Sequence, residues 1–134
     1  MFPAYDDTYV PTKTPSKQGE TLAQLYTRVA ATARAIIDRS DSEGHRAVVL
    51  CSHAAVVIAL GRVLTGSVPD TPDVEDFQAF TCGLSLYRRQ GGVILQDVAD
   101  TRDSETSSEM ALGGWTCELN SDCSFLSSGA ERGW

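Results

Sequence analysis

Residues 46–60 limit what this chain can fold into more than any other stretch. Their first part holds a continuous apolar run at 47–51, which is typical of a parallel strand buried on both faces. The second part, 54–64, is rich in alanine and leucine, is long enough for a helix and is closed by Gly66. A buried strand that leads directly into a helix is the unit of α/β folds, so the sequence predicts that class.

Ser52 and His53 stand between this predicted strand and helix. Ligands of open α/β sheets bind at the carboxyl ends of the strands, and free N–H groups at the start of a helix favour an anion. The imidazole of His53 can add a charge-assisted hydrogen bond to a phosphoryl oxygen, worth roughly 1.5–3 kcal/mol when desolvated. The alternative for this position is a structural histidine whose ring is satisfied by neighbouring backbone.

The sequence Val-Val-Leu-Cys-Ser-His-Ala-Ala-Val-Val-Ile-Ala-Leu resembles the second histidine motif of the histidine phosphatase (phosphoglycerate mutase-like) superfamily. In that family a strand ends in a histidine, usually followed by glycine, and a helix comes next. Here Ala54 takes the glycine position and narrows the space beside the phosphate. The resemblance implies that His53 is a catalytic residue that binds the phosphoryl group, with Ser52 and Ala54 beside it at a substrate-binding turn.

A second helix is predicted upstream, over residues 21–39. Thr21 begins a capping box, and apolar residues recur behind it at helical spacing. The Gly-Glu-Thr sequence at 19–21, with Arg28 nine positions after the glycine, resembles the Gly-Glu-Ser helix that precedes the second histidine in the same superfamily. Glu20 therefore has two interpretations. Its carboxylate binds substrate in the phosphate pocket or, as its position favours, serves its own helix terminus.

Catalysis in this superfamily also requires an early Arg-His-Gly turn with a nucleophilic histidine, a further arginine clamp and a carboxylate acid. The 134 residues contain no Arg-His-Gly. The other histidine, His45, precedes the predicted strand, so we expect it at the end opposite the phosphate turn. The resemblance covers residues 12–100 and is to the carboxyl-terminal half of a histidine phosphatase, which should be inactive alone.

The fold that this resemblance implies is α/β: an incomplete three-layer α/β/α phosphoglycerate mutase-like domain with a mostly parallel sheet. Residues 46–52 would be its central strand, and an antiparallel strand pair at 83–98 would turn at two glycines. Without the family's first strand, one edge of the central strand would be unpaired. Unpaired edges invite association, so self-association or a protein partner is expected there.

The acidic composition narrows the range of partners. A net charge of −7 and a pI near 4.6 argue against direct nucleic-acid binding. No apolar run approaches the roughly 20 residues of a membrane span, and the N-terminus does not look like a secretory signal. We therefore expect an intracellular protein, in the cytoplasm or nucleus, that binds a phosphorylated small molecule or phosphate anion weakly.

Neither a metal nor another cofactor is predicted. The four cysteines show no C-x-x-C spacing, which favours reduced thiols over a zinc site or a disulfide framework. The acidic residues of the loop at 67–76, which are Asp70, Asp73, Glu75 and Asp76, are expected to form a solvated surface.

The chain divides by composition into four predicted parts. Residues 1–18 form a loop leading into the domain, 19–100 the half-domain, 101–112 a polar linker and 113–134 an aromatic tail that docks as an appendage. The tail sequence Cys-Ser-Phe-Leu-Ser-Ser-Gly-Ala-Glu-Arg resembles the segment after the phosphatase-like domain in certain fungal proteins. Among these are phosphatase-like subunits of the box-B-binding transcription factor of RNA polymerase III.

Three functional hypotheses follow. The chain is the carboxyl-terminal half of a phosphomonoesterase or mutase domain, with His53 as its second phosphate-binding histidine. Alternatively, it is a phosphatase-like scaffold or interaction module, such as a subunit of an RNA polymerase III transcription factor. The missing Arg-His-Gly and the alanine at position 54 favour this hypothesis. The third hypothesis is an incomplete α/β domain with no independent role.

Overall fold

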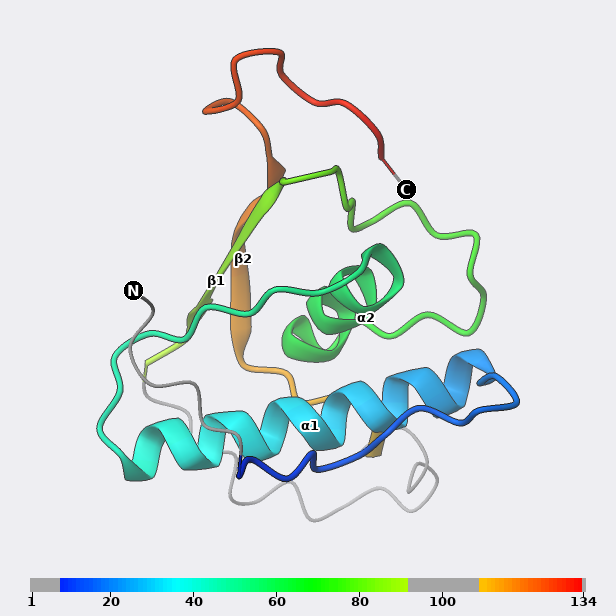
Figure 1. The fold of residues 1–134 in the computed structure, drawn as a ribbon, viewed down its shortest axis with the longest axis vertical. Helices are drawn as coiled ribbons and strands as arrows, with labels where there is room; N and C mark the ends of the chain where they lie inside the picture. Colours follow the sequence, from blue (N-terminus) through cyan, green and yellow to red (C-terminus); the bar gives the residue numbers. More distant parts are fainter. Residues whose placement is uncertain (1–7, 92–108, 134) are drawn as a thin grey trace.

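The computed structural model describes residues 8–91 and 109–133, and these contain two helices and two strands (Figure 1). In chain order they are α1 (Leu22–Ser42), α2 (Ala54–Thr65), β1 (Leu84–Arg89) and β2 (Trp115–Asp122). This arrangement agrees with the predicted α/β class. The predicted three layers and mostly parallel sheet are not seen among these residues, whose sheet has two antiparallel strands.

Both helices begin and end where local sequence signals place them, to within a few residues. The Thr21 hydroxyl accepts from the Gln24 N–H and the Gln24 side chain accepts from the Thr21 N–H, so the predicted capping box is present. α1 continues three residues past the predicted end at residue 39 and reaches Ser42. α2 ends at Gly66, whose φ of 79° is left-handed backbone that glycine adopts without strain.

The core lies where α1 crosses α2. Its buried members are Tyr26, Val29 and Ala30 from α1, and Ala59 and Val63 from α2. These residues recur at helical spacing on each helix, so each helix turns one apolar stripe toward the other. The packing of α1 on α2 is therefore what holds the described part of the helical layer together.

The sheet joins segments that are far apart in the sequence. β1 pairs with β2 antiparallel, with Tyr87 opposite Cys117 and Arg89 opposite Trp115, and the register shifts on either side of Leu86. β2 thus comes from the region predicted to be an appended tail. The predicted partner of β1 at 93–98 lies outside the described residues.

The segment 46–52 is not the buried strand that its sequence predicts. Predicted as a buried central strand, it is extended but belongs to no strand, and it runs from the end of α1 to the start of α2 (Figure 1). None of the backbone hydrogen bonds among the described residues joins it to β1 or β2. Val49 is 91% exposed. An apolar run is buried only where neighbouring strands cover it, and no described strand lies against this one.

Within the described residues, no helix is both long enough and apolar enough to cross a membrane.

Candidate functional site

The predicted phosphate turn is present at the start of α2. His53 is the N-cap residue, with φ −93° and ψ 158°, and its carbonyl accepts hydrogen bonds of 3.0 Å from the N–H groups of Val56 and Val57. The N–H groups of Ala54 and Ala55 make no backbone hydrogen bond among the described residues, as expected of a first helical turn. Two donors and the positive end of the α2 dipole therefore face outward here.

The side chains at this turn are open to solvent. Ser52 and His53 are exposed, and Ala54 is half-buried. The His53 side chain makes no cap hydrogen bond, and the described residues offer its imidazole no other hydrogen bond or ion pair. The turn can therefore offer an anion two backbone donors and, when protonated, one cationic ring.

Glu20 is engaged elsewhere. Its carboxylate accepts two hydrogen bonds from Arg28 on α1, at 2.6 Å from Nε and 2.8 Å from Nη2, and both side chains are largely buried. These hydrogen bonds lower the pKa of Glu20 and raise the pKa of Arg28. No contact among the described residues joins Glu20 to the turn at Ser52 and His53. The structure thus brings Ser52, His53 and Ala54 together and leaves Glu20 paired with Arg28.

Three further basic groups on and beside the helices have acidic partners. Arg39 binds Glu43 at the end of α1, and His45 Nδ1 lies 3.5 Å from the same carboxylate. Arg62 of α2 binds Asp76. A phosphate at His53 would need cationic donors that these pairs do not supply, because each guanidinium is already neutralised by its partner.

Arg62 is a buried polar centre that was not predicted from the sequence. Its side chain is 6% exposed and forms three kinds of hydrogen bond: to the Asp76 carboxylate at 2.9 Å, to the Tyr26 hydroxyl at 2.7 Å and to the Val74 carbonyl at 2.6 Å. Asp76, predicted to lie on a solvated surface, is instead half-buried against it. A charged residue in the apolar sequence Ala-Leu-Gly-Arg-Val-Leu was the available signal, because a buried charge requires a partner.

The described residues hold no group of three or more His, Cys, Asp or Glu side chains placed to bind a metal ion. Their four cysteines are free thiols, of which Cys51 and Cys82 are exposed and Cys123 is buried.

Comparison with known proteins identifies the class to which this fold and turn belong. The family model of the histidine phosphatase superfamily (branch 1) matches residues 4–100, which include α1, the His53 turn, α2 and β1. The chain therefore belongs to the histidine phosphatase superfamily. This confirms the family resemblance drawn from the two motifs.

A curated relative agrees with the narrower resemblance. The chain is 31% identical over 137 residues to the transcription factor tau 55 kDa subunit of Saccharomyces cerevisiae. The match covers 92% of this chain and 30% of that subunit. The chain thus spans less than a third of the length of this relative. Most of the chain aligns with it, including the region of β2.

Proposed function

We propose that this chain acts as a histidine phosphatase-like interaction module and does not turn over phosphomonoesters on its own. The observation that carries the proposal is the segment 46–52, which presents apolar side chains beside an incomplete phosphate turn and pairs with no strand of the described residues. Val48, Val49 and Leu50 are all exposed, and none of them pairs with either described strand. Exposed apolar groups of this kind mark surfaces that bind other proteins.

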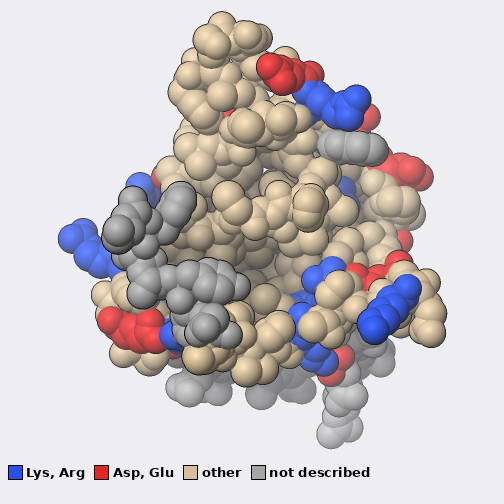
Figure 2. Space-filling view, in the orientation of Figure 1, with Lys and Arg blue, Asp and Glu red and all other residues tan. Residues whose placement is uncertain are grey.

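Further exposed apolar residues lie near this segment. Tyr9 and Val10 are exposed as well, and they share a groove of about 590 Å³ with the start of the segment and the second half of α1. Figure 2 shows that the middle of the face in view is largely free of Lys, Arg, Asp and Glu, which lie around its margin. A partner that covered these residues would bury apolar area and pair free N–H and C=O groups.

The absence of turnover follows from what phosphoryl transfer requires. A nucleophilic imidazole, cationic donors for the oxyanions and an acid for the leaving group must meet at one place. The sequence has no Arg-His-Gly, and Arg28 and Arg62 are bound to carboxylates. In a chain that also held the Arg-His-Gly turn, His53 would bind the phosphoryl group and stabilise the charge of transfer.

A turnover assay with p-nitrophenyl phosphate tests this part of the proposal. The 134-residue chain should give the background rate, and His53→Ala should be indistinguishable from the parent. Activity well above background that disappears on His53→Ala would show that the chain holds a nucleophile, and the proposal would be wrong.

The turn itself should still bind an anion, with a dissociation constant in the millimolar range or weaker. Each missing charge-assisted contact removes roughly 1.5–3 kcal/mol, so two missing arginines cost about two to four powers of ten in affinity. A phosphate titration followed on the His53 ring signals by NMR measures this affinity. Shifts confined to other residues would assign His53 a structural role.

The relative suggests where such a module works. That protein is by name a subunit of a transcription factor, and we extend this to a nuclear location and to a multi-subunit partner for the present chain. Replacing the matching region of the yeast subunit with this chain gives a direct test. The hybrid should purify together with the remaining subunits, and a Val49→Lys hybrid should do so less well. A hybrid that purifies alone would contradict the assignment.

A further inference from the structure

A second groove lies apart from segment 46–52, and it reaches the start of α2 at Ala55, next to the His53 turn. A groove of about 770 Å³ runs between the first half of α1, one face of α2 and the loop that follows α2. Its floor is apolar and only partly covered, and it is made by Leu22, Leu25, Ile58, Phe77 and Phe80. A volume of this size falls within the ~300–1,000 Å³ of typical ligand sites.

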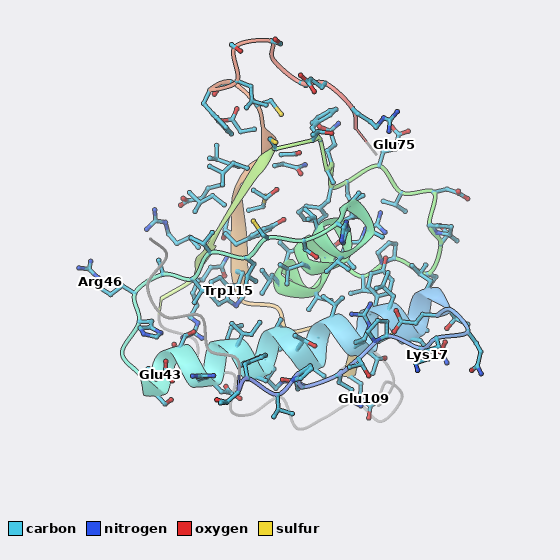
Figure 3. All side chains as sticks on the ribbon, in the orientation of Figure 1. Lys17, Glu43, Arg46, Glu75, Glu109 and Trp115 are labelled. Atoms are coloured by element: carbon cyan, nitrogen blue, oxygen red, sulfur yellow. The ribbon has the colours of Figure 1, made fainter. Side chains whose placement is uncertain are left out.

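One wall of this groove is acidic. Asp73 and Glu75 line it, both are exposed, and the described residues offer neither carboxylate an ion pair or a hydrogen-bond donor. Figure 3 shows Glu75 on the loop that passes around α2, across the molecule from Arg46 at the start of the exposed segment. The wall thus carries two uncompensated negative charges beside an apolar floor, on a chain whose net charge is −7.

Arg62 holds this wall in place. Its guanidinium binds the carbonyl of Val74 and the carboxylate of Asp76, the two residues that alternate with Asp73 and Glu75 along the loop. Because Arg62 is buried and also bonded to Tyr26 of α1, the loop is fixed to both helices. A rim that is ordered before binding loses less conformational entropy when a ligand arrives.

We propose that this groove binds a cationic amphipathic segment of a partner protein. Apolar side chains of the segment enter the floor between α1 and α2, and its Lys or Arg side chains pair with Asp73 and Glu75. The charge of the rim excludes acidic ligands such as phosphates and nucleic acid, because unpaired like charges would face one another. This surface is independent of the proposed function at segment 46–52.

The test uses the 134-residue chain and a fluorescent synthetic peptide of Lys and Leu, about three helical turns long, with its Leu residues on one face. Binding is measured by fluorescence anisotropy at low and high salt. The double variant Asp73→Asn/Glu75→Gln should weaken binding about fivefold, because two partly screened charge pairs are lost. The matched control Asp38→Asn/Glu109→Gln removes the same charge from exposed positions outside the groove and should change affinity by less than about twofold.

Two further measurements locate the interaction. A peptide with Ser in place of Leu keeps its charge and should bind much more weakly, because it has no apolar side chains to bury on the floor of the groove. Val49→Lys should leave peptide binding unchanged, which separates this groove from segment 46–52. Three outcomes would each overturn the proposal. They are an equal loss of peptide affinity in the groove variant and the control, binding of the Ser peptide as tight as that of the Leu peptide, and loss of peptide binding in Val49→Lys.

Discussion

At the scale of single residues, Gly61 is the position where the packing leaves least room. A Cβ placed there would lie 2.6 Å from Cδ1 of Phe77 and 2.7 Å from Oη of Tyr87, both on segments that pack against α2. These distances are too short for any real contact, so the rings would have to move. Glycine at this position of α2 therefore permits the close approach of Phe77 and Tyr87.

Gly61→Ala should lower the free energy of unfolding by about 1 kcal/mol. Overpacking costs about 1–3 kcal/mol, and the better helix propensity of alanine offsets up to about 1 kcal/mol of this. Urea denaturation measures the difference. Gly91→Ala is the control, since a Cβ there meets no atom within 4 Å. An alanine variant at 61 as stable as the parent would show that the two rings yield freely.

Tyr87 gives the structure a dependence on high pH. Burial, with Cys117 and Asp76 nearby, raises the pKa of Tyr87 to about 12 from an ordinary value of 10.0. Because the folded pKa lies above the unfolded one, the stability that it contributes is complete below pH 10 and is lost as the pH rises toward 12.

Tyr87→Phe should remove this contribution. Between pH 10 and pH 12 the free energy of unfolding should fall more in the parent than in the variant. The stability of Tyr87→Phe relative to the parent should therefore rise with pH. Cys117, whose pKa burial also raises, interacts with Tyr87, so the comparison measures the contribution of the two groups together. Parallel stability curves over this range would mean that Tyr87 ionises as easily in the folded chain as in the unfolded one.

At the scale of elements, Arg62 connects α2 to α1 and to the loop at 67–83. Arg62→Met should lower the unfolding free energy by about 3 kcal/mol, because it leaves the Asp76 carboxylate without its cationic partner and removes the N–H that donates to the Tyr26 hydroxyl. Thermal and urea denaturation check this. Arg88→Met is the matched control: it breaks a pair with Glu118 in which the arginine side chain is 72% exposed, so it should cost less than about 1 kcal/mol. Similar losses in the two variants would show that burial of Arg62 adds nothing.

The elements also show which parts of the fold can be predicted from sequence. The capping box at Thr21 and the left-handed Gly66 depend on residues a few positions apart, and both helices were predicted from them. The strand pair depends on contacts some 30 residues apart, such as Tyr87 with Cys117, which no local pattern encodes. The prediction that segment 46–52 is buried was wrong for the same reason, since burial depends on neighbouring elements and not on composition alone.

In the candidate site, too, the features that depend on local sequence were predicted and those that depend on distant residues were not. The position of His53 at the start of α2 follows from a strand-to-helix pattern that is local, and the structure places it there. The partners of Glu20 and Asp76 were not predicted, because each carboxylate meets an arginine eight or fourteen residues away through the folding of a loop. The roles of Ser52, His53, Ala54 and Glu20 in binding substrate stay predictions.

At the scale of the whole molecule, the exposed segment should make the chain associate with itself. The run at 47–51 carries no charge, so two copies can align there without repulsion. Sedimentation velocity should show a mass that rises with concentration, and Val49→Lys should shift the equilibrium toward the monomer. Asp38→Asn serves as a control on α1, away from the segment. A concentration-independent monomer would contradict self-association.

The pairing of β1 with β2 bears on where this protein can be cut. The family match ends at residue 100, yet β1 is completed by Trp115–Asp122, and the carbonyl of Val63 on α2 accepts a hydrogen bond from Leu112. A shortened protein that stopped at residue 100 would keep the whole recognisable family region and lose this strand. For recombinant expression, the practical C-terminal boundary therefore lies beyond the family boundary and past the end of β2 at Asp122.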